Sequence, residues 1–160
     1  MPSVHGAPPQ LDRIDRQILA SLQEDARRTV AEVAALVSLS PSPCWRRIRQ
    51  LDEAGLIAGY HARLDRRKLG WSVHGFVHLQ LENHAEDTAA AFEREVQALD
   101  QVLACHNLSG KYDYQLEVIG RSVDDFSAFV RDRVRRLPGV REIATSFSLR
   151  EVKGERRVPL

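Results

Sequence analysis

Apolar residues recur every three or four positions in three successive stretches near the start of the chain. The first stretch runs from Leu11 to Leu22 and has Asp12 available as a helix cap. In the second, Thr29 and Glu32 have the spacing of a capping box ahead of an apolar run. Only residues 38–40 separate that run from the third stretch. The pattern predicts helix, helix, tight turn and helix, which is the order of a helix-turn-helix.

The third stretch, residues 38–55, contains residue types that begin and end a helix. Ser40 is expected to cap the helix with its side chain, Pro41 suits the first turn, and Gly55 suits a left-handed exit. A short helix with a polar face fits the major groove of DNA. At helical spacing the apolar face comprises Cys44, Ile48 and Leu51, and the polar face comprises Ser42, Arg46, Arg49 and Gln50.

An arginine-rich face is also typical of plain solvated surface, and three helices can form a bundle without a ligand. The arginines gather on the last helix rather than on the first, which favours DNA. Arg46 and Arg49 are the expected base readers, while Arg47 and the amides at the helix start are expected to contact phosphate. Trp45 is expected to pack against the first helix or the linker. The predicted DNA-binding residues are Ser40, Pro41, Ser42, Pro43, Arg46, Arg47, Arg49 and Gln50.

Beyond Gly70 the period changes, and alternation over residues 71–82 predicts a strand. The order strand, helix, strand, strand, helix, strand predicts the ferredoxin-like split arrangement. Such a sheet has helices on one face only, and Phe76 on the other parity favours a homodimer through the uncovered face. The later predicted elements are a helix over 86–99, a strand over 102–108, a turn over 109–113, a strand over 114–119, a helix over 123–137 and a strand over 140–152.

The predicted fold class is α+β, with a helix-turn-helix domain ahead of a ferredoxin-like βαββαβ domain. Residues 55–60 are expected to leave the helices as a short strand or an extended segment. The predicted divisions are a disordered arm over 1–10, the helix-turn-helix over 11–60, a basic linker over 61–70, the ferredoxin-like domain over 71–153 and a tail over 154–160.

Charge is unevenly distributed between these parts. Residues 1–69 hold 11 Lys and Arg against 8 Asp and Glu, whereas residues 70–160 hold 12 against 14. A basic first part and an acidic remainder suit a polyanion-binding module joined to a different domain. Cys44 and Cys105 lie in apolar patterns, which indicates buried free thiols. With no apolar run of membrane-span length and no secretory signal, a cytoplasmic protein is expected.

An enzyme is the main competing class. His74 and His78 share one face of a strand, but no third metal ligand stands at suitable spacing. Cys105 and His106 are adjacent strand residues that point to opposite faces, so they cannot form a thiolate–imidazole pair. The sequence contains neither a phosphate-binding glycine loop nor a nucleophile elbow. We therefore expect no catalysis, no metal and no cofactor.

Six stretches of sequence stand out together: residues 11–19, 39–51, 55–60, 105–114, 137–140 and 151–153. In order and spacing they resemble the Lrp/AsnC family of bacterial and archaeal transcription regulators, also called feast/famine regulators. The resemblance implies a winged helix-turn-helix that reads promoter DNA and a ligand-sensing domain. It also implies homodimers that pair through the sheet and assemble into tetramers or octamers, with an amino acid or related metabolite bound between dimers.

Effector contacts are carried over by position from the same resemblance. Lys111 departs from the family, which frequently has an acidic residue there; a lysine suits an effector carboxylate or nothing, so the effector class stays open. The same segment is also consistent with an ordinary hairpin turn around Gly110. The implied effector residues are Ser109, Gly110, Lys111, Tyr112, Asp113 and Tyr114, with Ser146, Phe147 and Ser148 on the last strand.

The expected function is therefore sequence-specific regulation of transcription, with assembly or DNA affinity that responds to an amino acid or related metabolite. An architectural protein that coats DNA with little sequence preference and no effector is the alternative.

Overall fold

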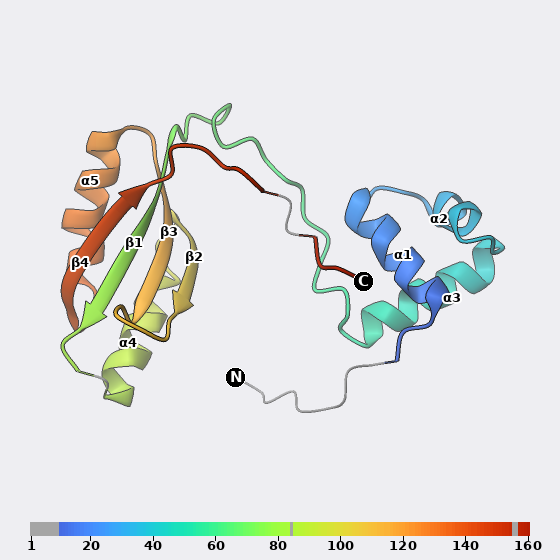
Figure 1. Cartoon of the computed structure of the whole chain (residues 1–160), viewed down its shortest axis with the longest axis horizontal. Helices are drawn as coiled ribbons and strands as arrows, with labels where there is room; N and C mark the ends of the chain where they lie inside the picture. Colours follow the sequence, from blue (N-terminus) through green and yellow to red (C-terminus); the bar gives the residue numbers. More distant parts are fainter. Residues whose placement is uncertain (1–9, 84, 155–156) are drawn as a thin grey trace. The chain divides into compact units, whose positions relative to one another are not determined.

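The computed structural model in Figure 1 describes residues 10–83, 85–154 and 157–160. The chain divides into two compact units. The first extends to Arg63 and takes in the end of the chain, and the second runs from Leu64 to Gly154. The predicted N-terminal arm, residues 1–10, lies outside the described residues except for Gln10.

Three helices form the first unit: α1 (Arg13–Glu24), α2 (Val30–Leu36) and α3 (Pro41–Glu53). A capping box begins α2, as predicted, because side chain and backbone bond reciprocally between Thr29 and Glu32. Asp12 caps α1, as predicted, and with Asp15 it also forms a capping box that was not predicted from the sequence. The helix-turn-helix prediction is confirmed at this level. The helices enclose one core of Ile18, Leu19, Val33, Ala34, Val37, Cys44 and Leu51.

The turn between α2 and α3 is a Schellman motif built on a serine. Ser38 has φ 57°, and the Leu39 N–H donates to the Ala34 carbonyl at 2.9 Å. The end of α3 repeats this geometry with the predicted glycine: Gly55 has φ 70°, and Leu56 N–H donates to the Leu51 carbonyl at 3.1 Å. Because only glycine adopts this conformation without strain, Ser38 carries a backbone cost that Gly55 avoids.

The start of α3 corrects one prediction. Ser40 occupies the N-cap position, but its side chain makes no capping hydrogen bond. Pro43 stands at the third helical position and has no N–H to donate to the hydroxyl. Pro41 likewise lacks an N–H, and the Cys44 N–H already donates to the Ser40 carbonyl at 3.3 Å. The two prolines thus remove most of the unsatisfied donors that a cap serves.

Residues 54–72, all of them described, contain no strand. Of the two alternatives for residues 55–60, the short strand is therefore wrong, and the segment leaves α3 through a turn and without regular structure. No β-strand occurs among the described residues of the first unit, so the wing implied by the family resemblance is not formed there.

The second unit contains β1 (Val73–Leu81), α4 (Glu86–Val96), β2 (Val102–Asn107), β3 (Tyr114–Gly120), α5 (Val123–Asp132), the 3-10 turn η1 (Val134–Arg136) and β4 (Val140–Phe147). Every strand pair is antiparallel and the order across the sheet is β2-β3-β1-β4. The predicted βαββαβ order is confirmed. The final strand ends at Phe147 rather than at residue 152, because its pairing with β1 stops at Gly75.

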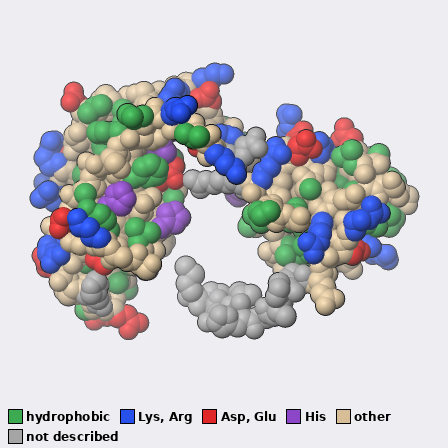
Figure 2. Space-filling model, in the orientation of Figure 1, with side chains coloured by type: hydrophobic (Ala, Val, Ile, Leu, Met, Phe, Trp, Pro, Cys, Tyr) green, Lys and Arg blue, Asp and Glu red, His purple; other side chains and the backbone are tan. Residues whose placement is uncertain are grey.

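The two faces of this sheet differ in composition. Helices α4 and α5 cover one face, where Phe92 and Phe126 pack on Val77, Leu79 and Leu116. Directly opposed residues share a face, so the strand register defines the other side. Histidines are prominent there, and Figure 2 shows them over the sheet. This open face comprises His74, Phe76, His78, Gln80, Ala104, His106, Gln115, Glu117, Ile119, Glu142, Ala144 and Ser146.

The two left-handed turns of the first unit make a matched test of backbone strain. Ser38→Gly is expected to stabilise this unit by about 0.5–1 kcal/mol, because the left-handed cost disappears while the unfolded chain gains freedom. Gly55→Ser is expected to destabilise it by a similar amount, since a Cβ at Gly55 meets nothing within 4 Å and only backbone strain is added. Urea unfolding followed by Trp45 fluorescence in a Trp71→Phe background measures both. Shifts of the same sign in the two variants contradict the prediction.

Candidate functional site

The outer face of α3 has the composition predicted for it. Ser42, Arg46, Arg49 and Gln50 are all exposed, whereas Cys44 and Leu51 are buried in the core. Along this face no carboxylate appears until the last turn of the helix. The surface therefore presents cationic and amide donors and one hydroxyl, which suit both base edges and phosphates.

Trp45 lies on this face and not against α1 or the linker, which corrects the sequence prediction. Its side chain is 51% exposed, and the Arg49 guanidinium lies 5.6 Å from the centre of its ring. Arg49 Nε also donates to Glu53 Oε1 at 2.7 Å. Trp45, Arg49 and Glu53 thus form a ladder at i, i+4 spacing. Trp45 is exposed although the preceding residue, Cys44, is buried, because successive side chains of a helix point about 100° apart. This difference in direction could have been predicted from the sequence.

Arg47 joins α3 to α1. Its Nη1 lies 2.7 Å from Asp12 Oδ2 and 2.7 Å from Asp15 Oδ1, and the Arg47 side chain is 30% exposed. The pKa of Asp12 is lowered, first by the backbone N–H of Asp15 and then by Arg47. The guanidinium that was predicted to contact phosphate is therefore already committed to two carboxylates of its own chain.

Few free amides remain at the start of α3. Pro41 and Pro43 have no N–H, so Ser42 supplies the remaining free donor of the first turn. An anion approaching this end meets one backbone amide and two hydroxyls rather than the three or four amides of an ordinary helix start. This narrows the predicted phosphate contact to Ser40 and Ser42.

The turn between β2 and β3 is fixed to β1 by hydrogen bonds. Leu81 N–H donates to Asp113 Oδ2 at 2.8 Å, and the Asp113 N–H donates to the Leu79 carbonyl at 2.9 Å. Gly110 has φ 131°, as expected for a turn glycine. Asp113 is therefore an anchor of the turn.

Lys111 and Tyr112 lie beside residues that sequence reasoning missed. The Lys111 carbonyl accepts a hydrogen bond from Gln80 Nε2, and Gln80 Oε1 accepts one from Arg141 Nη2 at 2.8 Å. Lys111 Nζ lies 5.0 Å from the centre of the Tyr112 ring, which lies 5.2 Å from the His78 ring. His78 and Gln80 share the open face of β1, so the alternation of this strand was the signal for both.

Tyr114 does not join this group. Its ring is buried against Phe92, with ring centres 4.5 Å apart, and its hydroxyl donates to Glu93 Oε1 at 2.9 Å. Burial and then Glu93 raise the pKa of Tyr114 to about 12. The side chain belongs to the core under α4, which corrects its assignment as an effector contact.

The last-strand residues predicted to meet the effector lie at the other end of β1. Ser148 N–H donates to the His74 carbonyl at 2.8 Å, whereas the turn is attached to Leu81. His74 and Leu81 are about 23 Å apart along the strand at 3.3 Å per residue. Within one protomer, Ser146, Phe147 and Ser148 are therefore not brought together with the turn.

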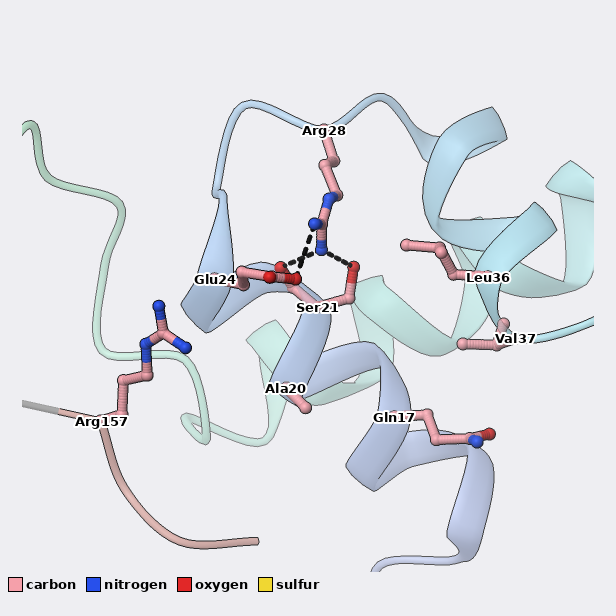
Figure 3. Close-up of a pocket in the computed structure, with 8 residues that line it drawn as sticks. All are labelled: Gln17, Ala20, Ser21, Glu24, Arg28, Leu36, Val37 and Arg157. Atoms are coloured by element: carbon pink, nitrogen blue, oxygen red, sulfur yellow. Dashed lines mark hydrogen bonds and ion pairs between the residues drawn. The ribbon is translucent and has the colours of Figure 1, made fainter.

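Figure 3 shows a hollow of about 380 Å³ on the first unit, lined by residues of α1, α2 and the end of the chain. Arg28 closes its floor by donating to the Ser21 carbonyl and Oγ and to Glu24 Oε2. Because Arg28, Ser21 and Glu24 are hydrogen-bonded to one another, they do not form a set of polar groups directed at a ligand in the hollow. Among the described residues, no group of three or more His, Cys, Asp or Glu side chains is placed to hold a metal ion.

Cys44 is buried and Cys105 is half-buried, so the predicted burial holds fully for Cys44 alone. Burial, followed by the charge of Glu93, raises the pKa of Cys105 to about 11, which keeps this thiol protonated at neutral pH. No helix in the described part of the chain is long and apolar enough to cross a membrane.

The fold and these surfaces define a DNA-binding module joined to a small-molecule sensing module. Residues 11–52 match the AsnC-type helix-turn-helix domain, and residues 74–158 match the Lrp/AsnC ligand binding domain. The chain belongs to the Lrp/AsnC family of DNA-binding transcription regulators with an amino-acid-responsive domain, and it is not an enzyme.

Similar proteins span nearly the whole chain. The Bkd operon transcriptional regulator of Pseudomonas aeruginosa is 36% identical over 94% of this chain and 99% of its own length. The leucine-responsive regulatory protein of Escherichia coli is 38% identical over 92% of this chain and 90% of its own. Among solved structures, a Neisseria meningitidis transcriptional regulator in complex with L-Met has TM-score 0.90, 35% identity and coverage of 94% of this chain and 97% of that one. An AsnC family regulator from Agrobacterium tumefaciens has TM-score 0.88, 32% identity and coverage of 93% and 97%.

The position of Arg47 leads to a test that separates a structural role from a DNA role. Arg47→Ala is expected to lower the urea midpoint of the first unit, because Asp12 and Asp15 lose their shared cation. Arg46→Ala, its exposed neighbour, is the control and is expected to leave the midpoint unchanged. The folded pKa of Asp12 is depressed below 3.8, so its contribution is present above that pH and is lost as the pH falls below it. The difference between wild type and Arg47→Ala should therefore shrink below about pH 4, and equal midpoints at neutral pH contradict the prediction.

Proposed function

We propose that two copies of the chain pair through the open faces of their sheets and present two α3 helices to successive major grooves of one operator. The observation that carries this is the outer face of α3, which is exposed and cationic within a unit of AsnC helix-turn-helix type. A twofold dimer reaches two half-sites about 34 Å apart, or one turn of DNA. The open sheet face supports the pairing, since it carries Phe76 and the nearly buried His74 without a covering helix.

Roles within α3 follow from the contacts of each side chain. Arg46, which is exposed and makes no ion pair within the described part of the chain, reads a guanine edge. Arg49 reads a second base. Its guanidinium either releases its hydrogen bond to Glu53 to contact DNA or contacts DNA while it stays stacked on Trp45. Ser40, Ser42 and Gln50 contact phosphate or neighbouring bases, and Pro41 and Pro43 shape the helix start. Arg47 contributes mainly by holding α3 in place.

The effector, we infer, is bound by its carboxylate at the turn between β2 and β3. Lys111 and Arg141 supply two cations, since Gln80 accepts from the Arg141 guanidinium and donates to the Lys111 backbone carbonyl, and Asp113 is engaged with the backbone of Leu81. Tyr112 and His78 offer a flat surface for an effector side chain. The similarity to a regulator solved with L-Met supports an amino acid as the ligand class. The exposed Glu142, opposite Gln80 on the sheet, is the nearest candidate for the ammonium group.

Because the turn and Ser146 to Ser148 lie at opposite ends of β1, a site that uses both must draw them from different copies. We propose that assembly beyond the dimer, to a tetramer or octamer, brings them together, so that effector binding biases assembly. The regulator acts on promoter DNA in the bacterial cytoplasm.

Arginine-to-alanine variants test the reading of DNA. Arg46→Ala and Arg49→Ala are each expected to cost about 1–3 kcal/mol of operator affinity and to relax selectivity at one base pair. Arg27→Ala is the matched control, because Arg27 is 92% exposed in the same unit but lies away from α3. Fluorescence anisotropy titrations with the promoter region of the protein's own gene give the affinities. Unchanged affinity in both α3 variants excludes α3 as the reading helix.

The same titrations separate specific regulation from general coating of DNA. A specific regulator is expected to prefer its operator over random duplex by about 10³-fold or more at physiological salt. If the affinities for operator and random duplex are nearly equal, the architectural alternative is favoured. In that case the binding constant should fall with salt concentration at a rate set only by the number of arginine–phosphate contacts.

Lys111 provides a test of the effector proposal. In a thermal-shift screen of amino acids, a ligand at a hundred times its dissociation constant stabilises the protein by about 2.7 kcal/mol. Lys111→Ala is expected to abolish most of that shift, Lys111→Arg to retain part of it, and the amide analogue of the active amino acid to give none. Lys153→Ala, an exposed lysine of the C-terminal segment, is the control. An undiminished shift in Lys111→Ala contradicts carboxylate binding by this lysine.

A further inference from the structure

The indole of Trp45 is exposed although it is a large apolar group. It is 51% exposed, whereas Leu51 of the same helix is 5% exposed and Ile48 is partly buried against the core. Trp45 lies at one edge of the outer face, three positions after Ser42 and four before Arg49, and Arg46 points about 100° away from it. At helical spacing these four residues form one patch. An apolar ring thus lies within the surface proposed to meet DNA.

The ring is also held in a defined position. The Arg49 guanidinium lies 5.6 Å from its centre, and Glu53 holds that guanidinium from the other side at 2.7 Å. A cation over the ring restrains both side chains, so less freedom is lost when the patch meets a ligand. The indole is therefore presented in advance rather than free to fold away.

The charges around the ring decide what kind of ligand suits it. Arg49 lies over the indole and the exposed Arg46 belongs to the same outer face, so the patch suits a polyanion that also exposes apolar groups, rather than an apolar protein groove. In the major groove, the apolar group that a base pair presents is the C5-methyl of thymine. Stacking of the indole between bases would require a few kcal/mol of unstacking, whereas contact with a methyl at the groove surface requires none.

We propose that Trp45 is a specificity-determining residue that recognises thymine by its methyl group, next to the base read by Arg49. This inference rests on the proposed reading of DNA by α3. Four residues of helix span about 6 Å, and successive base pairs are about 3.4 Å apart. The recognised thymine therefore lies within about two base pairs of the base that Arg49 contacts.

The test uses the highest-affinity duplex that the wild-type protein selects from random-sequence DNA, prepared once with thymine and once with uracil. Uracil pairs like thymine but lacks the methyl, so the affinity ratio of the two duplexes isolates methyl contacts. Wild type is expected to bind the thymine duplex about fourfold more tightly for each contacted methyl, because burial of one such group contributes about 0.8 kcal/mol. Trp45→Ala is expected to bring the ratio close to one, and Trp45→Phe to keep an intermediate ratio.

Leu36→Ala is the matched control, since Leu36 is a 58% exposed apolar residue on α2 of the same unit. Its ratio should equal that of wild type, and unfolding curves of all variants establish that each is folded. A Trp45→Ala protein that keeps the wild-type ratio overturns the inference, as does a selected duplex without thymine within about two base pairs of the base that Arg49 contacts. Unchanged operator affinity in both Arg46→Ala and Arg49→Ala is a separate result, which contradicts the proposed reading of DNA by α3.

Discussion

The orientation of α3 depends on one ion-pair cluster. Arg47 reaches across from α3 to both Asp12 and Asp15, the two residues that also build the capping box of α1. One guanidinium therefore ties α3, the proposed reading helix, to the capped start of α1. Because successive side chains of a helix differ in direction by about 100°, holding Arg47 inward directs Trp45, Arg46 and Arg49 outward. The ion pair thus acts together with the buried Cys44 and Leu51 to turn the cationic face of α3 to solvent.

In the second unit, β1 is the element that positions both the core residues and the residues of the open face. Its inward residues, such as Val77 and Leu79, pack beneath α4 and α5, while His78 and Gln80 alternate with them on the open face. Gln80 bonds to the turn of Lys111, so the proposed effector contacts are attached to the strand whose open face is proposed to pair with a second copy. Sensing and assembly thus share one rigid strand, which is a direct physical route for coupling them.

Several features were predictable because they depend on near neighbours in the chain. The capping boxes at Asp12 and Thr29 and the exit at Gly55 follow from residues no more than four positions away. The absence of a side-chain cap at Ser40 could also have been predicted from the sequence, since Pro43 has no N–H to donate to the Ser40 hydroxyl. By contrast, Ser38 in a left-handed turn is an exception to residue preference, imposed by the close approach of α2 and α3.

The sequence by itself determined the order of helices and strands, the two faces of β1 and the outward set on α3, because periodicity and capping act within a turn of helix or a few residues of strand. Only the tertiary structure decided which charges meet. Arg47 finds carboxylates 35 and 32 residues away, and Arg141 finds Gln80 at a separation of 61. Such partners are set by how elements pack rather than by spacing. The same holds for Tyr114, whose position beside the turn indicated a ligand contact, although packing on Phe92 places it in the core.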